Sequence, residues 1–394
     1  MKLLNPFKNV LYSTVLVRYL FYFIGFAEIL ILPKILDKKI YASFEYNKNL
    51  ILMFPYILLG AHNGYIYLKY TKQKDAFQTL FNMGIMVSTF FALIISLLLE
   101  NYYLIIPFLA INFFTLIEQR LKVDNQFLLA FTFKPLVSLI SICITLLSAL
   151  IIPDANQLSF FSFLIAFLIW ILFVNKKKKI SNLVHLRLNK YSIIKFYYLI
   201  KLKFTDILAS LTLASLMFFE RFLIEKYYFN QLASYSLAFN ISQIITILLG
   251  VFTYISSVKF GEEINTINKK KLVKYLKVLT FFFLVIYILI SLGLYLFASK
   301  IYSSFDGLLG ISVFLLFSKG FLALSGIFSP IAFYKDYNTE MFKVILGVLI
   351  INVLIGYIIA ISGLSLITIL IVDSLFLLFY SFYILDIVFR RISY

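Results

Sequence analysis

Runs of about 20 consecutive apolar residues recur along the whole chain, each long enough for a helix to cross a bilayer core of about 30 Å. The chain has 394 residues, of which 62% are hydrophobic and 14% are charged. Soluble globular proteins have about 45–50% apolar and about 25% charged residues. The runs leave only short connections, in which no soluble domain fits. The sequence therefore predicts an all-α membrane protein with about twelve transmembrane helices.

Residues that break helices separate most of these runs, among them Pro33, Glu100, Pro153 and Gly363. Four further prolines, Pro55, Pro107, Pro135 and Pro330, fall inside the predicted helices, where we expect them to kink the chain. The predicted spans are 10–32, 45–68, 77–99, 102–119, 126–151, 158–174, 205–226, 231–258, 273–298, 307–333, 341–361 and 364–389.

Lysine and arginine residues gather in alternate connections, outnumbering those on the opposite side by roughly five to one. By the positive-inside rule, this asymmetry places both termini in the cytoplasm. The same distribution accounts for the net charge of +18. We therefore expect no nucleic-acid partner.

The longest cytoplasmic connection, 176–204, begins with four lysines and continues as a mixture of basic and aromatic residues. That mixture indicates a helix lying along the anionic inner leaflet. It divides the chain into a first lobe, 1–175, and a second lobe, 205–394, with six predicted helices each. The stretch 41–44 (YASF) resembles 232–235 (LASY) at nearly half the chain length. Six is an even number, so the lobes are predicted to form a parallel repeat.

The motifs of common enzyme and cofactor sites are missing from the sequence. There is no glycine-rich nucleotide loop and no zinc-protease motif. The only histidines, His62 and His185, are far apart, and Cys143 is the single cysteine. We expect no catalytic residues, no metal and no cofactor, and hence no enzyme.

Ionisable residues inside the predicted spans are the candidates for function, since each costs about 2.5–3.5 kcal/mol at the bilayer centre. Arg18, Lys134 and Lys319 lie deep in their helices, against one deep acid, Asp373. Pairing with a single acid cannot neutralise three cations, which favours a cationic cavity; internal salt bridges are the alternative. Arg221 and Lys48 join this set, although snorkelling or local pairing also explains cations near the outer ends of helices.

Two stretches resemble a known family. The segments 29–33 (ILILP), 41–44 (YASF) and 59–60 (LG) resemble the first two helices of the polysaccharide flippases of Wzx type, which include O-antigen flippases. The segments 220–224 (ERFLI) and 233–238 (ASYSLA) resemble the start of their second lobe. These flippases belong to the multidrug/oligosaccharidyl-lipid/polysaccharide exporter superfamily. Ser234 and Lys38-Lys39 depart from the family pattern, which has Gly before the Tyr and a more Gly-rich loop after Pro33.

The resemblance implies a MATE-like fold of two lobes around a cavity that opens to each side in turn. It implies movement of an undecaprenyl-pyrophosphate-linked oligosaccharide across the bacterial inner membrane, in lipopolysaccharide or related glycan synthesis. The partners would be that lipid-linked glycan, membrane lipid and the polysaccharide polymerase machinery. Arg18, Lys134, Lys319, Arg221 and Lys48 would bind the pyrophosphate.

Because no nucleotide motif is present, uphill transport would need a gradient of H⁺ or Na⁺. Asp373 is the best acidic candidate for coupling, with Asn352 and Asp206 as possible co-ligands. The alternative is that Asp373 is a permanent partner of Lys319 or Lys134.

Three other functions compete with this interpretation. A MATE-type drug exporter coupled to cations has the same predicted architecture, but would favour acids in its cavity. The lipid II flippase typically carries two further helices. A membrane-embedded polysaccharide polymerase or ligase needs large outer loops, and the longest one here has roughly a dozen residues, as expected of short interhelical connections.

Overall fold

The computed structural model describes residues 23–57, 76–123, 129–130, 132–147, 154–177, 190–263, 267–335 and 337–391. All regular structure in these ranges is helical, as the composition predicts. The chain forms two compact units, Met1–Lys203 and Phe204–Tyr394.

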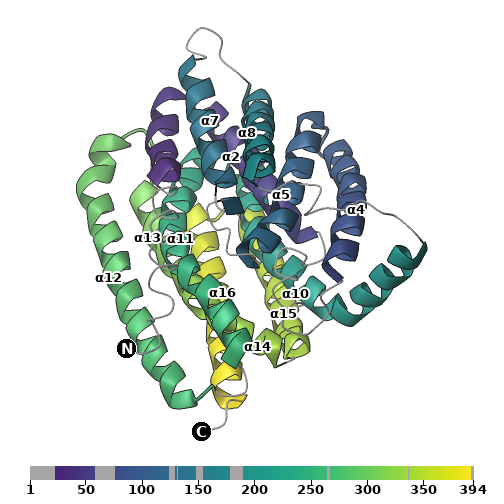
Figure 1. Ribbon diagram of the computed structural model, residues 1–394. Helices are drawn as coiled ribbons and strands as arrows, with labels where there is room; N and C mark the ends of the chain where they lie inside the picture. The colour runs from purple at the N-terminus through teal and green to yellow at the C-terminus, as the bar shows by residue number, and fades with distance from the viewer. Residues whose placement is uncertain are drawn as a thin grey trace. The chain divides into compact units, whose positions relative to one another are not determined.

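The first unit is a bundle in which α5 contacts α2, α4 and α8, while α8 also packs on α2 and α7. Its interior is a cluster of apolar side chains that includes stacked Phe54 and Phe108, with ring centroids 4.3 Å apart. Residues 23–35 are also helical. The elements (Figure 1) are α2 (Lys38–Met53), η2 (Phe54–Ile57), α4 (Ala76–Leu98), η3 (Tyr102–Leu104), α5 (Ile105–Val123), α7 (Phe133–Leu147) and α8 (Ala155–Lys177).

The second unit repeats this scheme around α13, which contacts α11, α12 and α16. The first of its helices begins before the boundary between the units. The elements are α10 (Lys190–Tyr227), η5 (Phe229–Gln231), α11 (Leu232–Glu263), α12 (Lys269–Ile301), α13 (Leu308–Gly326), α14 (Ser329–Tyr334), α15 (Asn338–Ile361) and α16 (Leu366–Arg391).

Among the described residues, four helix contacts of the first unit have counterparts in the second, although the contact of α2 with α8 has no counterpart of similar extent. The pairs α2·α5, α4·α5, α5·α8 and α7·α8 correspond to α11·α13, α12·α13, α13·α16 and α15·α16. Chain order and these contacts are therefore similar in the two units, as expected of the repeat that short sequence similarities indicated.

The prolines inside the predicted spans lie at or near changes in helical structure. Pro55 is the second residue of η2, Pro107 and Pro135 are the third residues of α5 and α7, and Pro330 is the second residue of α14. Pro135 and Pro330 lie in the first turns of α7 and α14, where the missing N–H has no intrahelical acceptor to lose. Pro55 and Pro107 instead lie in continuous helical runs, in which η2 follows α2 and α5 follows η3 without a break. The spans predicted at 126–151 and 307–333 are consequently interrupted, at Thr132 and at Ile327-Phe328.

Helix α10 is longer than the sequence predicts. It joins the second half of the basic connection 176–204 to the predicted span 205–226 in one helix of 38 residues. At 1.5 Å per residue it is about 57 Å long, nearly twice the thickness of a bilayer core. Ile193, Ile194, Tyr197 and Tyr198 are exposed on its first part.

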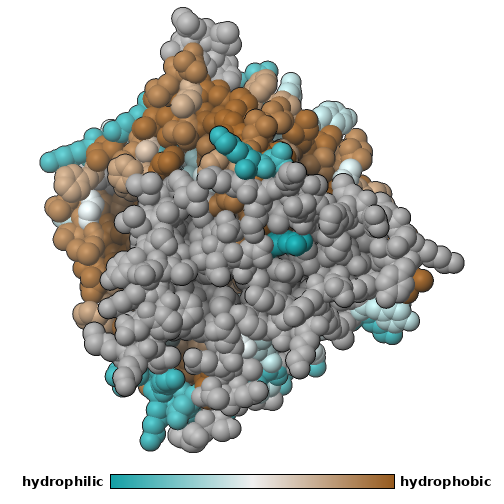
Figure 2. Space-filling model, in the orientation of Figure 1, coloured by the Kyte–Doolittle hydropathy of each residue, from teal (hydrophilic) through white to brown (hydrophobic). Residues whose placement is uncertain are grey.

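Six helices among the described residues are long and apolar enough to cross a membrane: α8, α11 with η5, α12, α13, α15 and α16. Many large apolar side chains lie on the outside, and only 17% of the most apolar window of α12, at the left of Figure 1, is buried. Figure 2 shows apolar side chains over much of the described surface on the viewer's side. Water would oppose such a surface, whereas lipid matches it. The chain is a multi-pass membrane protein.

Close packing in the second unit depends on Gly320 in α13. A Cβ at this position would overlap the Phe283 ring of α12 and would lie 2.7 Å from a methyl carbon of Ile245 of α11. Glycine therefore lets α13 approach both neighbours closely, as small residues do at helix contacts in membranes. The residue before it, Lys319, is held in the interior of the unit.

Candidate functional site

Four charged side chains are buried together in the second unit, and we call them the charged cluster. Glu220 and Arg221 come from α10, Lys319 from α13 and Asp373 from α16. Their exposed fractions are 2%, 3%, 3% and 3%. Charged groups buried to this degree are rare unless they are paired or functional.

Lys319 and Glu220 form an ion pair without a hydrogen bond. The Lys319 Nζ lies 3.9 Å from Glu220 Oε2, which is longer than a charge-assisted hydrogen bond of about 2.7–2.9 Å. Within the described part of the chain, neither Nζ nor either carboxylate oxygen has a hydrogen-bond partner. The pair therefore keeps hydrogen-bonding capacity that a third group can use.

Phe239 of α11 joins the two cations of the cluster. Arg221 Cζ lies 3.4 Å and Lys319 Nζ lies 3.2 Å from the centroid of its ring. Both distances are well inside the range of about 6 Å in which a cation is attracted to an aromatic face. Tyr235, one turn earlier in α11, is a second ring near Lys319, with 6.0 Å between Nζ and the centroid.

Asp373 is held by Asn352 of α15, whose Nδ2 donates a hydrogen bond of 2.8 Å to Asp373 Oδ1. Asp373 also interacts electrostatically with Glu220 and Lys319, which makes it part of the same cluster. The structure thus brings two of the residues predicted for ion coupling into contact. Among the described residues, no three His, Cys, Asp or Glu side chains gather closely enough to hold a metal ion.

The charged cluster corrects the expected surplus of cations. Two cations meet two acids, because Glu220 is buried beside Lys319 rather than exposed near the end of its helix. Helix α10 continues to Tyr227, seven residues beyond Glu220, so this carboxylate lies about 10 Å from the helix end. The ion-pair partner of Lys319 within salt-bridge distance is therefore Glu220 and not Asp373.

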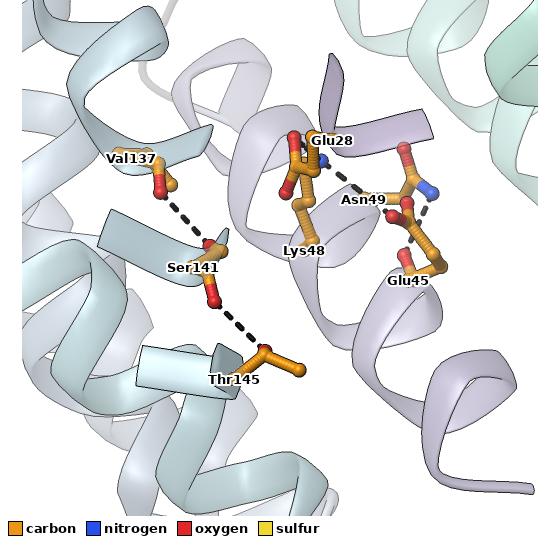
Figure 3. A network of polar contacts seen from close by, with 7 residues as sticks. All are labelled: Glu28, Glu45, Lys48, Asn49, Val137, Ser141 and Thr145. Atoms are coloured by element: carbon orange, nitrogen blue, oxygen red, sulfur yellow. Dashed lines mark hydrogen bonds and ion pairs between the residues drawn. The ribbon is translucent and has the colours of Figure 1, made fainter. Parts of the chain in front are cut away.

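A second buried group of charges lies in the first unit (Figure 3), formed by Glu28, Glu45 and Lys48. Lys48 Nζ lies 2.7 Å from Glu28 Oε2 and 3.6 Å from Glu45 Oε1. The i, i+3 pairing of Glu45 with Lys48 is as expected, whereas Glu28 is an additional and closer partner. Lys48 is therefore neutralised within its own unit.

The remaining predicted site residues do not join either group. Lys134 is exposed as the second residue of α7. Asp206 lies in α10, about 21 Å along the helix before Glu220, so it is not a co-ligand of Asp373. Arg18 lies outside the described residues.

Sequence reasoning missed Phe239, Tyr235 and the role of Glu220. One signal was available, because the segments 220–224 and 233–238 that carry the family resemblance contain Glu220, Arg221 and Tyr235. No pattern singles out Phe239 among 45 phenylalanines.

This arrangement of helices defines a polytopic membrane protein with the MATE fold. The chain is similar to the structure of a eukaryotic MATE transporter, with a TM-score of 0.67 and 12% identity over 98% of this chain and 97% of the other. It is similar to an outward-facing multidrug resistance MATE family transporter of the MOP superfamily, with a TM-score of 0.61 and 13% identity over 97% and 92% of the two chains. For an inward-facing MATE family transporter, the TM-score is 0.61, with 14% identity over 94% of each chain. No family model and no curated protein matches the sequence.

Proposed function

We propose that this protein is a flippase, which moves undecaprenyl-pyrophosphate-linked oligosaccharide units from the cytoplasmic to the periplasmic leaflet by alternating access. The observation that carries the proposal is the burial of Arg221 and Lys319 against one aromatic ring. The fold is shared with transporters that have been solved in outward-facing and inward-facing conformations.

An anionic headgroup gains most from cations in a medium of low dielectric constant, where Coulomb attraction is strongest. Arg221 offers a planar fork of N–H donors for phosphate oxygens, and Lys319 offers a compact ammonium. The present counter-ion of Lys319 is Glu220, at 3.9 Å and without a hydrogen bond. A phosphate oxygen would make a shorter contact and could displace it.

Under this proposal the protein lies in the bacterial inner membrane with both termini in the cytoplasm, and it supplies repeat units to a polysaccharide polymerase. It performs no chemistry on the glycan. A role in O-antigen synthesis follows from the sequence resemblance.

The test is a flipping assay with the full chain reconstituted in vesicles that contain a fluorescent undecaprenyl-pyrophosphate-linked sugar. Arg221→Ala and Lys319→Ala should each slow flipping by about tenfold or more, because loss of a buried charged contact costs about 1.5–3 kcal/mol. Lys226→Ala is the matched control, since Lys226 is an exposed cation of the same helix beside the Phe222 ring. The proposal would be refuted if Arg221→Ala and Lys319→Ala flipped the lipid as fast as the Lys226→Ala control and the wild type.

Ion coupling is proposed at Asp373 with Asn352. A carboxylate buried in a membrane either binds a proton or pairs with a cation, and the amide of Asn352 orients one of its oxygens. We expect Asp373→Asn to insert normally but to lose any dependence of the flipping rate on an H⁺ or Na⁺ gradient. Gradient dependence equal to that of the wild type would assign Asp373 a structural role.

One observation favours a second function, cation-coupled export of drugs. Glu220 and Asp373 equal the cations of the cluster in number, and a cationic drug needs acids. The same vesicles, loaded with ethidium in place of the lipid, separate the two functions, because only an exporter would move the dye.

A further inference from the structure

The charged cluster places two like charges against the same aromatic ring. Arg221 Cζ and Lys319 Nζ lie within 3.4 Å of the same ring centroid, so they are less than twice that distance apart. Their side chains come from different helices, α10 and α13. Repulsion between them is strong because both are almost completely buried, and another group must hold them together.

The acids of the cluster do not account for the position of the lysine. Lys319 Nζ is 3.9 Å from the oxygen of Glu220 but 3.2 Å from the centroid of Phe239. It makes no hydrogen bond within the described residues. Asp373 is directed toward Asn352 by a hydrogen bond. The aromatic ring is therefore the closest attractive group to the ammonium.

We infer that Phe239 is a positioning residue that holds Arg221 and Lys319 as a pair, and that this pair makes the site selective for diphosphate over monophosphate headgroups. The inference rests on the proposed function and specifies its headgroup. A diphosphate carries two adjacent charged phosphoryl groups, so each cation can contact one of them. A monophosphate has a single phosphoryl group, so it contacts only one of the two cations and leaves the other to the acids of the cluster.

The chemistry of the ring suits this role. A phenyl ring attracts both cations through its quadrupole, yet it carries no negative charge that would compete with an incoming phosphate. A carboxylate in the same place would neutralise the pair and weaken anion binding. Phe239 is itself only 6% exposed, and Tyr235 packs beside it with ring centroids 6.1 Å apart, which fixes the ring.

The experiment measures binding of farnesyl pyrophosphate and farnesyl monophosphate to the full chain in detergent by calorimetry. Phe239→Leu removes the π face and keeps an apolar side chain, whereas Phe239→Tyr keeps the face. Phe252→Leu is the matched control, an identical change in α11 at a ring that packs on Phe282. All variants are first checked for monodispersity.

We expect the wild type, Phe239→Tyr and Phe252→Leu to prefer the diphosphate by about tenfold or more, the factor that corresponds to one or two buried cation–π contacts. Phe239→Leu should lose most of this preference while its affinity for the monophosphate changes less than about twofold. An unchanged preference of Phe239→Leu for the diphosphate, or an equal loss of affinity for both probes, would overturn the inference and leave the flippase proposal standing. If the wild type binds neither probe, the proposed function itself fails.

A double-mutant cycle keeps the inference testable if Phe239→Leu does not fold. The losses of binding free energy caused by Arg221→Gln and Lys319→Gln should be non-additive for farnesyl pyrophosphate, so that the second change costs less than the first. For farnesyl monophosphate the two losses should be additive. Additive effects on both probes would show that the two cations act separately, against the inference.

Discussion

At the scale of single residues, the sequence predicted several of the charges that are buried but not their partners. Lys319 and Asp373 stood out because ionisable groups in apolar helices are rare. Their surroundings depend on which helices pack together, so Glu220 and Phe239 emerged only from the structure. Lys134 was predicted to lie deep in its span, whereas it is an exposed side chain in the first turn of α7.

The ion pair of Lys319 with Glu220 gives a charge-swap prediction. Glu220→Lys or Lys319→Glu alone places two like charges in the buried cluster, and we expect a loss of about 3–5 kcal/mol, enough to reduce yield severely. The double variant restores opposite charges and should recover much of the yield in the membrane fraction. Fluorescence size-exclusion chromatography measures this recovery, and a double variant no better than either single one would argue against a direct pair.

A left-handed backbone conformation at Glu100 gives a second prediction. Glu100 has φ 52° and Gly363 has φ 67°, and both residues end helices at exposed turns. A side chain in this region costs roughly 1–2 kcal/mol relative to glycine. Glu100→Gly should therefore raise the apparent Tm by about 1–3 °C, and Gly363→Ala should lower it. Shifts of the opposite sign in a thermal scan would contradict this account of the turns.

At the scale of elements, hydropathy predicted where helices lie, and breakers predicted most of their ends. The continuous α10 is the main exception, because the basic stretch before 204 lacks a helix stop signal and keeps helical backbone into the next span. Pro135 and Pro330 mark helix starts, so the predicted spans around them are interrupted, whereas Pro55 and Pro107 lie within continuous helical runs as predicted.

A substitution that adds one methyl group at position 320 tests how closely α13 packs on its neighbours. Gly320→Ala would bring the new Cβ within 2.7 Å of Ile245 and closer still to Phe283. Such overpacking costs about 1–3 kcal/mol, and it should also displace Lys319 and weaken farnesyl pyrophosphate binding. Gly347→Ala in α15 is the control, since no neighbouring helix among the described residues comes within 4 Å of the position that its Cβ would take. This change should be neutral or slightly stabilising. Equal stability and binding in both variants would show that α13 tolerates the larger residue.

At the scale of the whole molecule, charge bias predicts the orientation in the membrane. Reporter fusions after Lys122, Lys179 and Lys271 should be cytoplasmic, whereas fusions at Glu100, Asp154 and Gly363 should be periplasmic. Paired alkaline phosphatase and green fluorescent protein fusions measure this directly. A cytoplasmic signal at Asp154 would overturn the predicted number of crossings in the first lobe.

The sequence by itself determined the all-helical membrane class, because this class depends on local hydropathy along the chain. Only the tertiary structure decided which charges meet. Arg221, Phe239, Lys319 and Asp373 come from four different helices. Their contacts depend on helix rotation and on close approach at Gly320, which the hydrophobic pattern of each separate helix does not specify.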